Sequence, residues 1–226
     1  MNAVSTNRFE QRALRIAVGG GVVLDADLSL PDAARGLVLF AHGSGSSRFS
    51  PRNRHVARQL NQAGLATLLA DLLTPNEEAT DEQTRHLRFD IALLAERLVG
   101  VTDWLTGQAD RAALRIGHFG ASTGAGAALV AASQRPDLVR AVVSRGGRPD
   151  LAGLALPHVR APTLLIVGGD DTPVIALNRQ AFAQLRADKQ FVIVPGATHL
   201  FEEPGTLDSV AGLARDWFLL HLAKPG

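Results

Sequence analysis

The sequence predicts an α/β domain in which helices flank a mostly parallel central sheet of about eight strands. Short apolar runs alternate with segments of helical periodicity, a pattern typical of repeated β-α-β units. The 226 residues are enough to bury one large core, and a content of 46% hydrophobic and 20% charged residues is ordinary for a globular protein. We therefore expect one domain over residues 1–226, with residues 1–12 as a loose tail.

The order of the apolar and helical segments gives the expected elements. An antiparallel hairpin is expected at 14–18 and 22–30, around three consecutive glycines. Further strands are predicted from apolar runs at 36–41, 65–70, 114–119, 139–144, 163–167 and 191–194. Helices are predicted at 54–63, 85–105, 125–134, 175–185 and 207–221, with 85–105 as the longest.

Charge and composition narrow the class of function. The chain has 23 basic and 22 acidic residues, a balance that favours neither nucleic acid nor an anionic membrane surface as a partner. It has no cysteine, which excludes a disulfide, a thiolate nucleophile and a cysteine metal site. Residues 1–15 lack the apolar core of a signal peptide, and no window reaches the roughly 20 apolar residues of a membrane span. We expect a cytoplasmic protein.

The most informative motif is Gly-Ala-Ser-Thr-Gly at residues 120–124, between the apolar run 112–119 and a helical pattern. A nucleophilic serine on a strained turn between a strand and a helix requires this context. Side chains at Gly120 and Gly124 would collide with neighbouring backbone, so glycine meets a steric need at both positions. The motif therefore predicts that Ser122 is a nucleophile.

A serine hydroxyl needs a base within hydrogen-bond reach, and the base needs a carboxylate to orient it. His199 follows the last predicted strand, and Asp171 follows the strand at 163–167. Since ligands bind beyond the carboxyl ends of parallel strands, we expect Ser122, Asp171 and His199 to meet at one edge of the sheet. His118 lies inside a strand and is predicted to be a hydrogen-bonded core residue.

Acyl transfer also requires two donors for the oxyanion of the tetrahedral intermediate. The backbone N–H of Thr123 is one candidate, and that of Ser44, in the Gly- and Ser-rich loop 42–47, is the other. His42 is expected to brace this loop, and the alternative is that it contacts the substrate. A phosphate cradle is disfavoured for the same loop, because it lacks the Gly-Lys-Ser/Thr ending and the Gly-x-Gly-x-x-Gly spacing.

Together these motifs resemble the α/β-hydrolase superfamily, in particular its small dienelactone-hydrolase-like branch. The matching segments are 42–43, 120–124, 168–171 and 196–199. The resemblance implies a serine hydrolase of small to medium carboxylic esters or lactones, which works through an acyl-enzyme without metal or cofactor. It also selects Asp171 over Asp170, because the acid follows the strand-end glycine by three residues. Authentic dienelactone hydrolases use cysteine where this chain has Ser122.

The segment 145–162 is too short for the helical cap that the family often carries, so no cap domain is expected. The site is then either open or closed by a second copy of the chain. Arg145 and Arg148 begin this segment, and either could hold a carboxylate or phosphate of the substrate. The alternative for both is a loop ion pair with Asp150 or an exposed surface charge.

The sequence alone leaves other functions open. The same three residues serve other acyl chemistry, such as that of a peptidase, thioesterase or perhydrolase. Some α/β-hydrolase folds are catalytically silent interaction domains, and a fold alone does not decide between these. The expected ligand is a small-molecule ester, and Glu202 with Glu203 lack the spacing of a metal site. Asp71, Glu77, Glu78, Arg48 and Arg52 are secondary candidates for substrate contacts.

Overall fold

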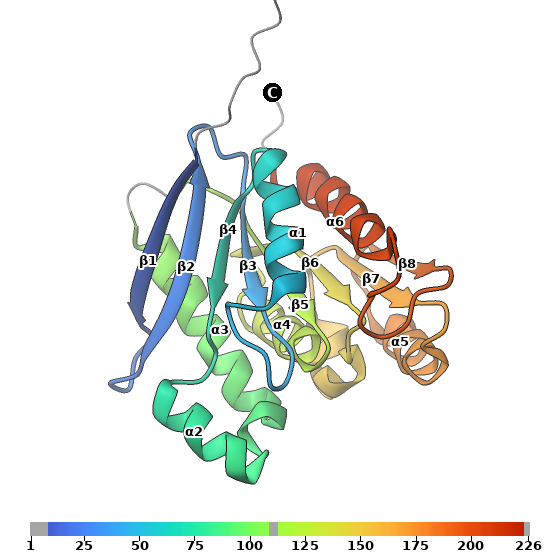
Figure 1. Cartoon of the computed structure of the whole chain (residues 1–226), viewed down its shortest axis with the longest axis horizontal. Coiled ribbons are helices and arrows are strands. Elements are labelled where there is room, and N and C mark those ends of the chain that lie inside the picture. The colour runs from blue at the N-terminus through green and yellow to red at the C-terminus, as the bar shows by residue number, and fades with distance from the viewer. Residues whose placement is uncertain (1–8, 109–112, 224–226) are drawn as a thin grey trace, which may run out of the picture.

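The computed structural model describes residues 9–108 and 113–223. Its centre is an eight-stranded sheet in the order β1-β2-β4-β3-β5-β6-β7-β8 (Figure 1). The pairs β1–β2 and β2–β4 are antiparallel, and the five other pairs are parallel. The predicted fold class, a mostly parallel sheet of about eight strands between helices, is confirmed.

The strands lie close to their predicted positions. They are β1 Phe9–Ala17, β2 Val23–Pro31, β3 Leu37–Ala41, β4 Ala66–Ala70, β5 Ile116–Ala121, β6 Val139–Arg145, β7 Thr163–Gly168 and β8 Lys189–Val194. The opening hairpin is confirmed but begins earlier than predicted. Residues 9–12 pair with 28–31 in β1 and β2, so they do not belong to a loose tail. Residues 1–8 of the predicted tail lie outside the described residues.

The helices are α1 Pro51–Gln62, α2 Pro75–Thr84, α3 Ile91–Thr106, α4 Thr123–Gln134, α5 Thr172–Gln184 and α6 Thr206–Leu222. Two 3-10 helices, η1 Leu87–Phe89 and η2 Pro149–His158, complete the described chain. Within the described ranges no helix is long and apolar enough to cross a membrane. The segment between β6 and β7, which was predicted to be too short for a cap, contains only η2.

The prediction of one longest helix over 85–105 was wrong. Arg85 has a left-handed backbone (φ 55°) that ends α2, and Asp90 caps α3 by accepting a hydrogen bond from the Leu93 N–H at 3.0 Å. α2 itself starts with a capping box, in which Thr74 and Glu77 bond each other's backbone N–H groups. Among the described helices α6 is the longest, with 17 residues against 16 in α3.

The helices bury the sheet on both faces. α1 and α6 cover one face, whereas α3, α4 and α5 cover the other (Figure 1). β3 shows how its sequence serves both cores: Leu37, Leu39 and Ala41 face one cluster, and Val38 and Phe40 face the other. A strand buried on both faces needs a continuous apolar run, which is why β3 could be predicted.

Candidate active site

The site lies at the carboxyl edge of the parallel strands. β5 ends at Ala121, and Ser122 occupies the turn into α4 with φ 50° and ψ −124°. For a residue with a side chain this backbone is strained, and such strain is characteristic of functional sites. The predicted steric need for glycine on both sides is confirmed. A Cβ on Gly120 would lie 2.4 Å from the Ala125 Cα, and one on Gly124 would lie 2.3 Å from the Ala41 carbonyl oxygen.

The predicted base and acid are joined. His199 Nδ1 lies 2.7 Å from Asp171 Oδ2, so Nδ1–H donates to the carboxylate and Nε2 remains to accept a proton. The Asp171 side chain is 11% exposed and that of His199 39%. A Cβ on Gly168, at the end of β7, would lie 2.3 Å from the Ala197 carbonyl oxygen. This glycine therefore lets the loop that carries His199 approach Asp171.

A neighbouring carboxylate holds the His199 loop in place. Glu203 accepts hydrogen bonds from the N–H and the hydroxyl of Thr198, at 3.1 and 2.6 Å. Both bonds lower the pKa of Glu203, and the bond from the Thr198 hydroxyl has the largest effect. Asp170, the acid next to Asp171, is exposed and donates its backbone N–H to the Ala197 carbonyl at 3.0 Å. The sequence had offered Glu203 only as an unsupported metal ligand, so its part in the loop was missed.

Ser122 and His199 line one pocket, with a volume of about 260 Å³. The pocket is also lined by Gly43, Ser44, Ser46, Ser50, Arg52, Asn53, Ala121, Arg145, Gly146 and Leu200. Within the described residues no hydrogen bond joins the Ser122 hydroxyl to His199. Catalytic hydrogen bonds are often long without substrate and shorten in the complex, so this geometry is compatible with a nucleophile and its base.

The loop after β3 packs directly on the serine. A Cβ on Gly43 would lie 3.0 Å from the Ser122 Cβ. The backbone N–H of Ser44, one predicted oxyanion donor, donates to the Thr123 hydroxyl at 2.9 Å. The other predicted donor, the N–H of Thr123, is at the first position of α4, where helix geometry supplies no partner within the helix.

His42 connects this loop to the end of β4. Its Nε2 accepts a hydrogen bond from the Leu72 N–H at 3.1 Å, and its Nδ1–H donates to the Gly43 carbonyl at 3.1 Å. Burial lowers the pKa of His42, which keeps the ring neutral and able to accept the first of these bonds. Both ring nitrogens of His42 therefore bond to backbone groups, one in this loop and one just after β4.

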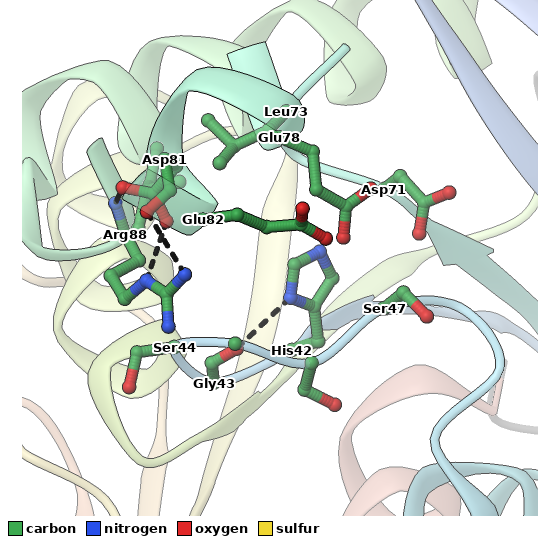
Figure 2. Close-up of a pocket in the computed structure, with 13 residues that line it drawn as sticks. His42, Gly43, Ser44, Ser47, Asp71, Leu73, Glu78, Asp81, Glu82 and Arg88 are labelled. Atoms are coloured by element: carbon green, nitrogen blue, oxygen red, sulfur yellow. Dashed lines mark hydrogen bonds and ion pairs between the residues drawn. The ribbon is translucent and has the colours of Figure 1, made fainter. Parts of the chain in front are cut away.

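A second pocket, of about 150 Å³, is lined by residues 42–47 and by side chains of α2 (Figure 2). Its acidic side chains are partly neutralised: Asp71 pairs with Arg48, and the buried Asp81 pairs with Arg88. Burial and the nearby Asp71 raise the pKa of Glu78. Throughout the part of the chain that is described, no group of three or more His, Asp or Glu side chains could hold a metal ion.

The two candidate arginines have different surroundings. Arg148 donates to both carboxylate oxygens of Asp150, with contacts of 2.9 and 2.8 Å. That is the loop ion pair considered as the alternative. Arg145, by contrast, ends β6, is only 6% exposed and lines the pocket of Ser122. Arg52 and Asn53, at the start of α1, line the same pocket. The sequence did not indicate that these two residues lie beside Arg145.

Comparison with known proteins places the chain in a family. A sequence model described as "Dienelactone hydrolase family" matches residues 24–216. The chain belongs to the dienelactone hydrolase family. It is 64% identical to a dienelactone hydrolase of known structure from Anabaena variabilis, with a TM-score of 0.93 over 95% of this chain and 99% of that one. Est1E from Butyrivibrio proteoclasticus shares the fold at 19% identity, with a TM-score of 0.75 over 92% of this chain and 98% of that one.

A Mycobacterium tuberculosis protein named "Putative phosphoribosyl transferase" is 61% identical over 209 residues. The match covers 92% of this chain but 46% of that protein. The chain therefore spans about half the length of this relative.

Proposed function

We propose that this chain is a serine hydrolase that cleaves small to medium carboxylic esters or lactones. The observation that carries the proposal is the strained Ser122 turn in one pocket with His199, whose Nδ1 is fixed by Asp171. This combination is the arrangement of an activated serine nucleophile. It favours a hydrolase over a silent interaction domain, which has no use for a strained serine and an oriented base.

The reaction proceeds in two halves. Ser122 Oγ attacks the ester carbonyl carbon while His199 Nε2 takes the hydroxyl proton, and Asp171 stabilises the resulting imidazolium. The tetrahedral intermediate then collapses: the C–O bond to the alcohol breaks, and His199 gives the alcohol its proton. Water attacks the acyl-enzyme by the same route, again losing a proton to His199, and releases the carboxylic acid and free Ser122.

The oxyanion is held by the N–H groups of Thr123 and Ser44. The Ser44 N–H must exchange its bond to the Thr123 hydroxyl for one to the oxyanion. A donor pair of this kind typically lowers the barrier by about 3 kcal/mol for each donor. Thr123 thus supplies one donor and holds the other near the serine before substrate binds.

The phosphoribosyl transferase name of the longer relative gives the alternative function. The match leaves more than half of that protein uncovered, whereas the Anabaena dienelactone hydrolase is matched over 99% of its length. For this chain we therefore propose ester hydrolysis rather than phosphoribosyl transfer.

A fluorophosphonate probe tests the proposal, because only an activated serine reacts with it quickly. We expect one labelled residue, Ser122, identified by mass spectrometry of the digested protein, and no labelling of Ser122→Ala. A panel of p-nitrophenyl esters, lactones and thioesters then separates esterase from thioesterase activity. A wild-type protein that is neither labelled nor active on any of these substrates is a silent interaction domain.

A further inference from the structure

Residues 146–148, here called the bridging loop, connect β6 to η2 and contact both the serine turn and the loop of its base. The Arg148 N–H donates to the Ser122 carbonyl at 2.9 Å. A Cβ on Gly146 would lie 2.9 Å from the His199 carbonyl oxygen, so the backbone of Gly146 packs closely on the histidine loop. The position of the bridging loop therefore bears on how the serine and the histidine lie relative to each other.

The serine turn needs such support. Ser122 has φ 50° and ψ −124°, and a strained backbone persists only where the surrounding structure fixes it. The bond from the Arg148 N–H is one of the contacts that fix it. The bridging loop must then be held in place itself. At its start, the Gly146 N–H donates to the Ile166 carbonyl of β7 at 2.8 Å.

Asn178 of α5 holds the middle of the bridging loop. Its Nδ2 donates to the Gly147 carbonyl at 2.9 Å and to the Val174 carbonyl at 2.8 Å. The two bonds use both amide protons, so the side chain is fixed between its own helix and the loop. Gly147 is closely packed on its other side, since a Cβ there would lie 2.0 Å from the Ser144 Oγ and 2.5 Å from the Ala125 Cβ.

The burial of Asn178 is not explained by stability alone. The residue is 0% exposed, and its Oδ1 is buried without a hydrogen-bond partner. A buried acceptor that lacks a donor costs free energy, whereas an apolar side chain of similar size would avoid this cost. Local departures of this kind are expected at positions that serve a site. α5 also follows directly on Asp171, so Asn178 links the helix next to the acid with the loop next to the serine.

We propose that Asn178 is a positioning residue of the hydrolase. By holding the Gly147 carbonyl it fixes the bridging loop, and through the Arg148 N–H it fixes the backbone of Ser122 relative to His199. The role rests on the proposed esterase function, to which it adds a residue that is not among those that line the Ser122 pocket. A misplacement of reacting groups by about 1 Å can lower a rate about 100-fold, so a single bond of this kind is enough to matter.

The rate of fluorophosphonate labelling tests the role, because it measures attack by Ser122 without a natural substrate. Asn178→Leu removes both donors with little change in size. The initial labelling rate, divided by the folded fraction from urea unfolding, should fall about 10- to 100-fold. A loss of stability alone would leave this corrected rate unchanged. With p-nitrophenyl acetate, kcat and kcat/KM should fall by the same factor, so that KM stays within about threefold of wild type.

The matched control is Asn61→Leu in α1. Asn61 is also a buried amide of a helix, 3% exposed, and its Nδ2 donates to the Leu65 carbonyl at 2.9 Å and to the Thr67 hydroxyl at 3.1 Å. None of these groups lines the Ser122 pocket. Asn61→Leu should therefore lose stability but keep its corrected labelling rate within about twofold of wild type, as expected for a change away from the reacting groups.

A second variant covers the case in which Asn178→Leu does not fold. In Asn178→Ser the hydroxyl can bond the Val174 carbonyl, as serines in helices do, but is too short to reach the Gly147 carbonyl. Its corrected labelling rate should fall in the same direction.

The outcomes separate this proposal from the proposed function. A corrected rate within about twofold of wild type in the folded Asn178 variant, or an equal loss in Asn61→Leu, overturns the positioning role and leaves the hydrolase intact. A wild-type protein that is neither labelled nor active on esters overturns the hydrolase, and the positioning role with it.

Discussion

His199 Nδ1 and Asp171 Oδ2 lie 2.7 Å apart although 28 residues separate them in sequence. Their meeting follows from the topology, because Asp171 follows β7 and His199 follows β8, which are adjacent parallel strands. The residue before Asp171 adds a backbone bond between the two loops: the Asp170 N–H donates to the Ala197 carbonyl in the His199 loop. The two loops therefore present one carboxylate, not both, to the imidazole.

The first prediction compares the two adjacent acids. Asp171→Asn should lower kcat by up to about 10⁴-fold, because an amide can hold the imidazole in the wrong tautomer and cannot stabilise the imidazolium. Asp170→Asn should change kcat by less than about tenfold, since its side chain is exposed and its contribution is a backbone bond. Steady-state kinetics on a p-nitrophenyl ester measures both. A larger loss in Asp170→Asn would assign the acid to the other residue.

The second prediction concerns acyl-chain length. The Ser122 pocket holds about 260 Å³, and the segment between β6 and β7 adds no cap over it. Each methylene contributes about 0.8 kcal/mol only if it is buried, so kcat/KM should stop rising beyond roughly C6. A series of p-nitrophenyl esters from acetate to laurate measures this. A preference for C12 would mean that an apolar surface outside the pocket receives the chain.

The third prediction tests the close packing at the serine turn. In Gly124→Ala the new Cβ would lie 2.3 and 2.5 Å from the carbonyl oxygens of Ala41 and His42, so the loop that carries Ser44 must move. Overpacking of this kind costs about 1 to 3 kcal/mol of unfolding free energy, and displacement of an oxyanion donor lowers kcat about 100-fold or more. Urea unfolding and steady-state kinetics measure the two effects.

The control for this substitution is Gly212→Ala in α6, where a Cβ would meet no atom within 4 Å. Alanine is the better helix former by up to about 1 kcal/mol, so this variant should be slightly more stable and fully active. Unchanged activity in Gly124→Ala would show that the loop adjusts without moving the donor.

Much of the fold and of the candidate site could be predicted from sequence because the signals are local. The strands β3 to β7 are short, mostly apolar runs. The Ser122 turn is marked by Gly120 and Gly124, where a Cβ would collide with neighbouring backbone. The meeting of Ser122, Asp171 and His199 at one edge then follows from parallel strands. Local pattern and topology were sufficient for these features.

The features that the sequence did not predict depend on signals that are weak or not local. α2 is mostly polar, so it has no apolar periodicity, and its sequence marks are confined to its start: the Thr74–Glu77 capping box and Pro75 at the first position. The difference between Arg145 and Arg148 is decided by which acceptor each side chain reaches in three dimensions. Asn53, which holds Arg145, comes from a helix 92 residues earlier, and no motif links the two.

The fourth prediction concerns acid stability and a buried histidine in β5. His118 is fully buried, with Nδ1 3.4 Å from the Ala128 carbonyl oxygen and Nε2 3.0 Å from the Thr102 hydroxyl. Burial lowers the pKa of His118 from 6.5 to about 4 in the folded protein. Between these values the unfolded chain binds a proton that the folded chain does not. The stabilisation is therefore complete above pH 6.5 and is lost as the pH falls towards 4.

One pKa unit corresponds to about 1.4 kcal/mol, so His118 alone should lower the free energy of unfolding by about 3 kcal/mol between pH 7 and pH 4. His118→Gln keeps polar atoms in the core but does not titrate. Urea unfolding of both proteins at several pH values in this range gives the two slopes, and subtraction removes what the other titrating groups contribute. We expect the variant to be less stable at pH 7 but to lose less stability on acidification. Parallel curves for the two proteins would show that His118 takes up its proton as readily in the folded state as in the unfolded one.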